Sequence, residues 1–182
     1  MPNNTFQGAT LRDLVEEQGG RYLDKTFLFF EEEEISYGKL DEIANKVGNA
    51  LRSLGVRKGD RVAIYLPNCT EYVLTFFGCF KIGAVAVPIN TLLKPPEGEY
   101  LLRNSQAKIL ITNGDNLARI DEIRGSCWDL TRTVVVNARV PEGCVPFDGF
   151  YRASSQAPEV AVAADDPAMI LYTAGTTGRP KG

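Results

Sequence analysis

Short apolar runs alternate with helical segments along most of this sequence, and this alternation limits the folds open to the chain. The apolar runs lie at 61–66, 84–87, 108–112, 133–136 and 168–172. Segments with helical patterning separate most of them, at about 71–82, 97–104 and 116–124. Short buried strands joined by helices are typical of parallel sheets. The sequence therefore predicts an α/β fold, with a parallel sheet flanked by helices on both faces and right-handed connections.

Earlier elements are expected before the first of these strands. A helix at 11–18 and a β-prone run at 26–30 come first, followed by four consecutive glutamates at 31–34. Such a charge run is most simply a solvated turn. Apolar residues between 40 and 54 then recur every three or four positions, which predicts a long amphipathic helix ended by Gly55.

The later part of the chain divides into two regions. Residues 137–160 are rich in Pro, Gly and Ser and are interpreted as a surface excursion. We expect one α/β subdomain over residues 1–160, followed over 161–182 by a last strand and a glycine-rich loop. No internal repeat or low-complexity tract is apparent in the sequence.

Composition excludes several functional classes. The net charge of −3 argues against a nucleic-acid binder, and the absence of histidine excludes a Ser-His-Asp or Cys-His nucleophile system within the chain. No cysteine pair has CxxC spacing, so no zinc site is indicated. The most apolar segment, 72–89, is interrupted by Lys81 and by glycines, which favours a buried core segment over a membrane span. The first residues do not resemble a signal peptide, and a cytoplasmic location is expected.

The last ten residues carry the strongest indication of function. Residues 173–182 contain three glycines, three threonines, an arginine and a lysine. Glycines allow successive backbone N–H groups to surround an anion, and a lysine adds a charge for phosphate oxygens. The segment follows an expected strand, which is where open α/β sheets bind ligands. It is not a Walker loop, because Pro180 and Gly182 stand where that motif needs glycine and Ser or Thr. Composition alone also permits an exposed turn without a ligand.

The order of residues in LYTAGTTGRPKG resembles the phosphate-loop signature of the adenylate-forming superfamily. That superfamily includes acyl-CoA synthetases, firefly-type luciferases and the adenylation domains of peptide synthetases. The usual form is close to YTSGTTGxPKG, and this sequence departs from it at Ala174. The stretches 36–68 and 71–93 are also similar to the family. KIGAVAVPIN is more typical of acyl- and aryl-CoA synthetases, with a weak preference for short-chain, medium-chain or carnitine-type ligases.

The resemblance implies a two-step reaction of a carboxylate with ATP and then CoA. An acyl-adenylate and pyrophosphate form first, and the CoA thiol then displaces AMP. The loop would hold the β- and γ-phosphates of ATP together with Mg²⁺. The phosphate-binding residues implied by the motif are Thr173, Ala174, Gly175, Thr176, Thr177, Gly178 and Lys181.

The resemblance also implies that other parts of the site lie beyond residue 182. These are the adenine pocket, the acidic residue that helps to bind Mg²⁺, the ribose-binding aspartate, the acyl pocket and the C-terminal domain with its catalytic lysine. We therefore expect no catalytic residue within these 182 residues and no adenylation by them alone. Two alternatives stay open: a peptide-synthetase adenylation domain and a non-catalytic nucleotide-binding module. A homodimer is compatible with the sequence.

Overall fold

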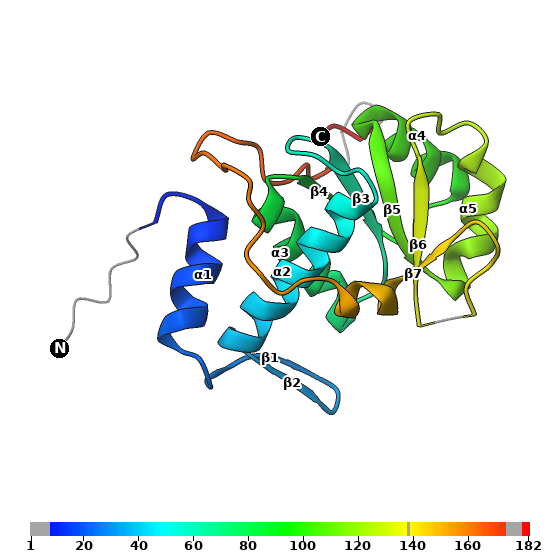
Figure 1. Ribbon diagram of the computed structural model, residues 1–182. Helices are drawn as coiled ribbons and strands as arrows, with labels where there is room; N and C mark the ends of the chain where they lie inside the picture. The colour runs from blue at the N-terminus through cyan, green and yellow to red at the C-terminus, as the bar shows by residue number, and fades with distance from the viewer. Residues whose placement is uncertain (1–7, 138, 174–179) are drawn as a thin grey trace.

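The computed structural model describes residues 8–137, 139–173 and 180–182 (Figure 1). Its helices are α1 (Leu11–Arg21), α2 (Tyr37–Ser53), α3 (Thr70–Ile82), α4 (Pro95–Ser105) and α5 (Leu117–Arg124), with short 3₁₀ helices at Gly114–Asn116 and Phe147–Arg152. Its strands are β1 (Thr26–Phe30), β2 (Glu33–Ser36), β3 (Arg61–Tyr65), β4 (Val85–Pro88), β5 (Ala107–Asn113), β6 (Arg132–Val136) and β7 (Val145–Pro146).

The central sheet has five parallel strands in the order β4-β3-β5-β6-β7. Side chains alternate across it: Val62 and Ile64 of β3 belong to one buried cluster, and Ala63 and Tyr65 belong to the other. The first cluster includes side chains from α2 and α3, and the second includes side chains from α4 and α5. These two pairs of helices lie on either side of the sheet (Figure 1). The prediction of a parallel sheet covered on both faces is therefore confirmed.

The first two helices begin at caps that the sequence supplies. Thr10 and Asp13 form a reciprocal capping box at the start of α1. The hydrogen bond from the Thr10 side chain, together with backbone N–H donors, lowers the pKa of Asp13. Ser36 caps α2 by accepting a hydrogen bond from the backbone N–H of Lys39 at 3.2 Å. These caps fix where α1 and α2 start, and α1 then packs along α2.

Helices α2 and α3 approach each other closely at glycines. A Cβ atom built on Gly78 would lie 2.3 Å from Cγ1 of Val47 and 3.2 Å from the backbone nitrogen of Gly48. A Cβ atom on Gly48 would in turn lie 3.1 Å from the carbonyl oxygen of Gly78. The two backbones therefore pack with no room for a side chain at Gly78 and little room for one at Gly48, which favours small residues at this crossing.

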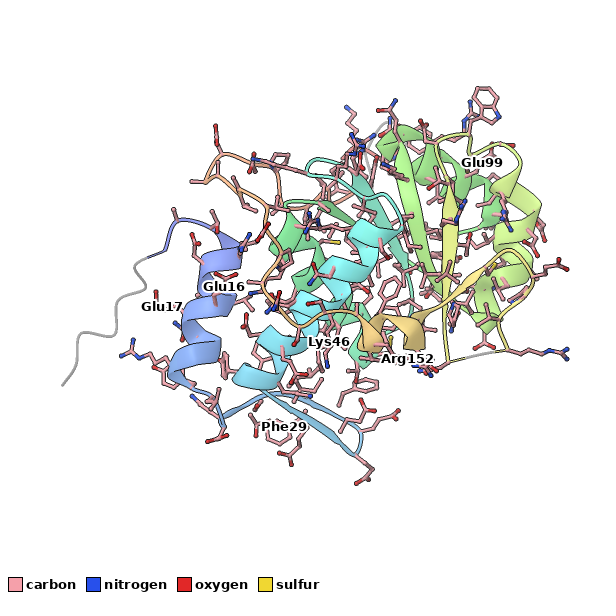
Figure 2. All side chains as sticks on the ribbon, in the orientation of Figure 1. Glu16, Glu17, Phe29, Lys46, Glu99 and Arg152 are labelled. Atoms are coloured by element: carbon pink, nitrogen blue, oxygen red, sulfur yellow. The ribbon has the colours of Figure 1, made fainter. Side chains whose placement is uncertain are left out.

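Lys81 on α3 is fully buried, with a side-chain exposure of 0%. Its ammonium group donates to Glu16 Oε1 on α1 at 3.0 Å and also to Asp41 Oδ1 on α2. Glu16 is labelled in Figure 2. Burial alone raises the pKa of Glu16, but the hydrogen bond and positive charge of Lys81 lower it by more, with a further contribution from Arg12. One buried cation thus joins three helices.

Two expectations about local structure need correction. All four glutamates at 31–34 are exposed, as expected of a solvated charge run, but the turn is made by Glu31 and Glu32, whereas Glu33 and Glu34 begin β2, which pairs antiparallel with β1. Figure 2 shows Phe29, which is 69% exposed, on this hairpin outside the helical layers. The supposed surface excursion at 137–160 contains β7 and a 3₁₀ helix, whose Phe147 and Phe150 are buried in the core. In both segments, contacts with other parts of the chain determine the structure that forms.

In the described part of the chain, no helix combines the length and the hydrophobicity needed to span a bilayer. The segment 72–89, which carries Lys81 and punctuating glycines, instead forms α3 and β4. Most of its apolar side chains belong to the two core clusters or pack against them. The interpretation of this segment as part of the core is confirmed.

Candidate phosphate-binding loop

The expected last strand, 168–172, is shorter in the structure than the apolar run suggests. Ala86 N donates to Ala168 O at 3.0 Å, and Ile170 N donates to Ala86 O at 2.9 Å. These bonds place Met169 parallel to Ala86, as an isolated bridge beside β4. Leu171 is already 59% exposed. The segment therefore runs beside the edge of the sheet in the predicted direction, but it pairs with β4 at a single position.

A charged turn leads the chain into this segment. The Asp166 carboxylate accepts a hydrogen bond from Ala163 N at 2.6 Å and forms an ion pair with Lys58 at 2.6 Å. The backbone hydrogen bond and the charge of Lys58 lower the pKa of Asp166. Lys58 lies just before β3, so this ion pair ties the turn to the sheet. The Asp166 carboxylate therefore stabilises the turn that precedes the last segment.

The two ends of the glycine-rich segment lie side by side. Thr173 N donates to Lys181 O at 3.0 Å, and Lys181 N donates to Thr173 O at 3.1 Å. This antiparallel bridge forms a neck that brings together the first and last predicted phosphate-binding residues. Both side chains are exposed, and no carboxylate among the described residues forms an ion pair with Lys181. An exposed ammonium without an acidic partner there is available to a phosphate.

The other predicted binding residues lie between the two ends of this neck, outside the described residues. They are Ala174, Gly175, Thr176, Thr177 and Gly178. Their assignment as phosphate ligands stays a prediction.

Helix α4 packs beside the neck. The hydroxyl of Tyr172 donates to Asn104 Oδ1 on α4 at 2.6 Å. Burial raises the pKa of Tyr172, and the nearby Tyr100 raises it further by a smaller amount. A solvent-open cavity of about 690 Å³ lies between α4 and the end of the loop and is lined by Arg103, Asn104 and Pro180, among others. Sequence reasoning missed Asn104, because nothing in the sequence links it to a tyrosine 68 positions away.

The family model for AMP-binding enzymes matches residues 15–182 of this sequence. The chain belongs to the AMP-binding enzyme family. The match includes the sheet, the neck and the helix beside it. The family membership implied by the resemblance of LYTAGTTGRPKG is thereby confirmed.

Curated relatives and solved structures agree with this membership. The crotonobetaine/carnitine–CoA ligase of Salmonella paratyphi B (strain ATCC BAA-1250 / SPB7) is 39% identical over 187 aligned residues, which cover 96% of this chain and 36% of that protein. The anthranilate CoA ligase AuaEII, solved in complex with anthranoyl-AMP, has a TM-score of 0.89 and 39% identity, covering 94% of this chain and 33% of that one. The N-terminal domain of FACL13 from Mycobacterium tuberculosis has a TM-score of 0.85 and 31% identity, covering 95% of this chain and 43% of that one.

This member of the AMP-binding family therefore spans about a third of the length of the curated relatives and of AuaEII, 36% and 33% respectively. The fold matches that of acyl-CoA ligases, and the FACL13 structure is itself described as an N-terminal domain. The fold is accordingly that of the N-terminal domain of adenylate-forming enzymes.

Proposed function

We propose that this chain forms the N-terminal part of an ATP-dependent, AMP-forming acyl-CoA synthetase. The observation that carries the proposal is the sequence TAGTTGRPKG, in which Thr173 and Lys181 are bridged in a neck past the segment that runs parallel to β4. That position, at the carboxyl side of an open parallel sheet, suits a ligand. Membership of the AMP-binding family and the similarity to CoA ligases support the same assignment.

In the proposed reaction, a carboxylate attacks the α-phosphorus of ATP and pyrophosphate departs. The loop contributes by placing backbone N–H groups, threonine hydroxyls and the Lys181 ammonium around the β- and γ-phosphates. Donors arranged before the reaction stabilise the charge that develops on the departing pyrophosphate. Mg²⁺ would share that charge, and its ligands are expected among residues beyond Gly182. The CoA thiol then attacks the carbonyl carbon of the resulting acyl-adenylate, and AMP departs as the thioester forms. We propose that this enzyme acts in the cytoplasm.

ATP–pyrophosphate exchange tests the proposal. The whole natural protein should exchange radiolabelled pyrophosphate into ATP when supplied with an appropriate carboxylate from a panel of crotonobetaine, carnitine, anthranilate and medium-chain fatty acids. Lys181→Ala should raise KM for ATP by about 10- to 100-fold, since a hydrogen bond to a charged group contributes about 1.5–3 kcal/mol. The 182-residue chain alone should show no exchange. Exchange at full rate by Lys181→Ala would contradict the role given to the loop.

Ala174 provides a second test, because the superfamily motif has serine there. Alanine keeps the backbone N–H but lacks the hydroxyl that could donate to a phosphate oxygen. We expect Ala174→Ser in the whole enzyme to lower KM for ATP or to raise kcat, by up to about tenfold. Ala174→Val, which adds volume without a hydroxyl, serves as the control. Unchanged steady-state constants for the serine variant would show that this hydroxyl has no role here.

A further inference from the structure

Tyr172 contacts both ends of the phosphate-binding segment. It directly precedes Thr173 in the sequence, so its backbone leads into one side of the neck. Its ring lies against the residue that follows Lys181 on the other side: a Cβ atom built on Gly182 would lie 2.8 Å from Cε1 and 2.9 Å from Cζ of Tyr172. Gly182 therefore leaves the space that the tyrosine ring occupies. One aromatic side chain spans the base of the neck.

The same tyrosine is attached to α4. Its hydroxyl donates to Asn104 Oδ1 at 2.6 Å, and its ring packs, with Ile170, against the buried cluster that includes Leu101 and Leu102. Those leucines are 2% and 3% exposed, so α4 is anchored firmly on the sheet. The contacts run from this buried cluster to Tyr172, and from there to the neck.

We infer that Tyr172 and Asn104 are positioning residues that hold the neck of the phosphate loop against α4. Through them, α4 sets the positions of Thr173 and Lys181, and therefore the direction in which the Lys181 ammonium can meet a phosphate. The inference rests on the proposed function, because it assumes that this loop binds the β- and γ-phosphates of ATP. Neither residue needs to touch the nucleotide.

The physical reason is that charge-assisted hydrogen bonds depend steeply on geometry. Donors held within about 0.5 Å of their productive positions need neighbours whose own conformations are locked by packing and hydrogen bonds. At the described positions, the neck itself has only the two backbone hydrogen bonds between Thr173 and Lys181. A further attachment to a buried helix is the means by which such a short bridge can keep a fixed orientation. Loosening that attachment should weaken phosphate binding without touching the rest of the nucleotide site.

Calorimetric titration of the whole natural protein with MgATP and, separately, with AMP tests the inference. Tyr172→Phe and Asn104→Leu should each raise Kd for MgATP about three- to tenfold while leaving Kd for AMP unchanged, since AMP lacks the β- and γ-phosphates. The Kd of the double variant for MgATP should be no higher than the higher of the two single-variant values, because both substitutions remove the same hydrogen bond. Gly182→Ala should weaken MgATP binding by more than tenfold, because its Cβ would displace the tyrosine ring and also meet Cγ2 of Ile170 at 2.7 Å.

A matched control lies on the same face of the sheet. Tyr65 also donates its hydroxyl to an acceptor in another segment, the carbonyl oxygen of Thr91, at 3.3 Å. Tyr65→Phe should leave Kd for both nucleotides unchanged, and thermal unfolding should confirm that the phenylalanine variants remain folded.

Two outcomes would overturn the inference alone: MgATP affinity unchanged in Tyr172→Phe and Asn104→Leu, or an equal loss of affinity for MgATP and AMP. In either case a selective loss of MgATP affinity in Lys181→Ala would leave the proposed function intact. A natural protein that binds no MgATP would overturn both.

Discussion

Replacing Glu16 and Asp41 together by Gln and Asn is expected to destabilise the fold by about 3–5 kcal/mol, because this change leaves a buried cation without its two negatively charged partners. Lys81 is 0% exposed, and its two carboxylates come from two other helices. The cost should appear as a lower midpoint in urea unfolding, with an unchanged slope if the transition stays two-state. Either single replacement should cost less, since one carboxylate remains.

Adding Lys81→Met to the double variant should recover most of the loss. Methionine fills a similar volume without a charge, and the two amides keep part of their exposure to water. Lys39→Met is the control for loss of an ion pair, because Lys39 and Glu42 are 51% and 38% exposed at their side chains. An exposed pair of this kind contributes about 0–1 kcal/mol. If the Lys39 and the Glu16/Asp41 variants lose equal stability, burial of Lys81 is not the cause.

The same contacts predict a dependence on acid. The pKa of Glu16 lies below its ordinary value of 4.5 in the folded state, because Lys81 and Arg12 outweigh the effect of burial. Its contribution to stability is therefore fully present above pH 4.5 and is lost as the pH falls through the lowered folded-state pKa. Glu16→Gln should flatten the loss of stability over that acidic range. An acid unfolding curve of unchanged shape would argue against this linkage.

Gly78→Ala is expected to destabilise the protein by about 1–3 kcal/mol, although alanine favours helices over glycine by up to about 1 kcal/mol. The new Cβ would lie 2.3 Å from Cγ1 of Val47 and 2.7 Å from its Cβ. Real Cβ atoms do not approach other carbons so closely, so α2 and α3 would have to separate. Overpacking therefore outweighs helix propensity at this position. Thermal or urea unfolding measures the difference.

Two further variants separate these effects. Gly20→Ala, where a Cβ meets nothing within 4 Å in α1, should stabilise the protein by up to about 1 kcal/mol. Val47→Ala should relieve part of the loss caused by Gly78→Ala, so the two changes should be non-additive. Additive losses in the double variant would show that the strain does not arise from the contact between these two residues.

Most of the parallel sheet and the helices that cover it could be predicted because β3, β4, β5 and β6 are apolar runs with their own boundaries, whereas the two-residue β7 gives no such run. Strands β3, β5 and β6 and helices α2 and α3 follow directly from local patterns of hydrophobicity. The β1–β2 hairpin could not, since a run of glutamates gives no signal for pairing with Phe29 and its neighbours. The burial of Phe147 and Phe150 in the core could not be predicted either, because the sequence around them is rich in Gly and Pro and is typical of a surface loop.

The candidate site was predicted unevenly for a similar reason. The motif identified the loop, and the structure brings its ends, Thr173 and Lys181, together. Contacts between residues far apart in sequence could not be predicted: Tyr172 and Asn104 are 68 positions apart, and Lys81 and Glu16 are 65 apart. Interactions of this kind depend on the final packing of helices on the sheet, which single-sequence patterns do not contain.

The arrangement around Lys81 also determines where this protein can be trimmed. Helix α1 precedes the hairpin and the sheet, so it could be mistaken for a dispensable leader. Any version that starts after Arg21 would lose Glu16. Of the two carboxylates that pair with the Lys81 ammonium, Asp41 alone would then remain. Versions shortened at the N-terminus for crystallisation, or fused there to a tag, should therefore keep Thr10 and all the residues that follow it.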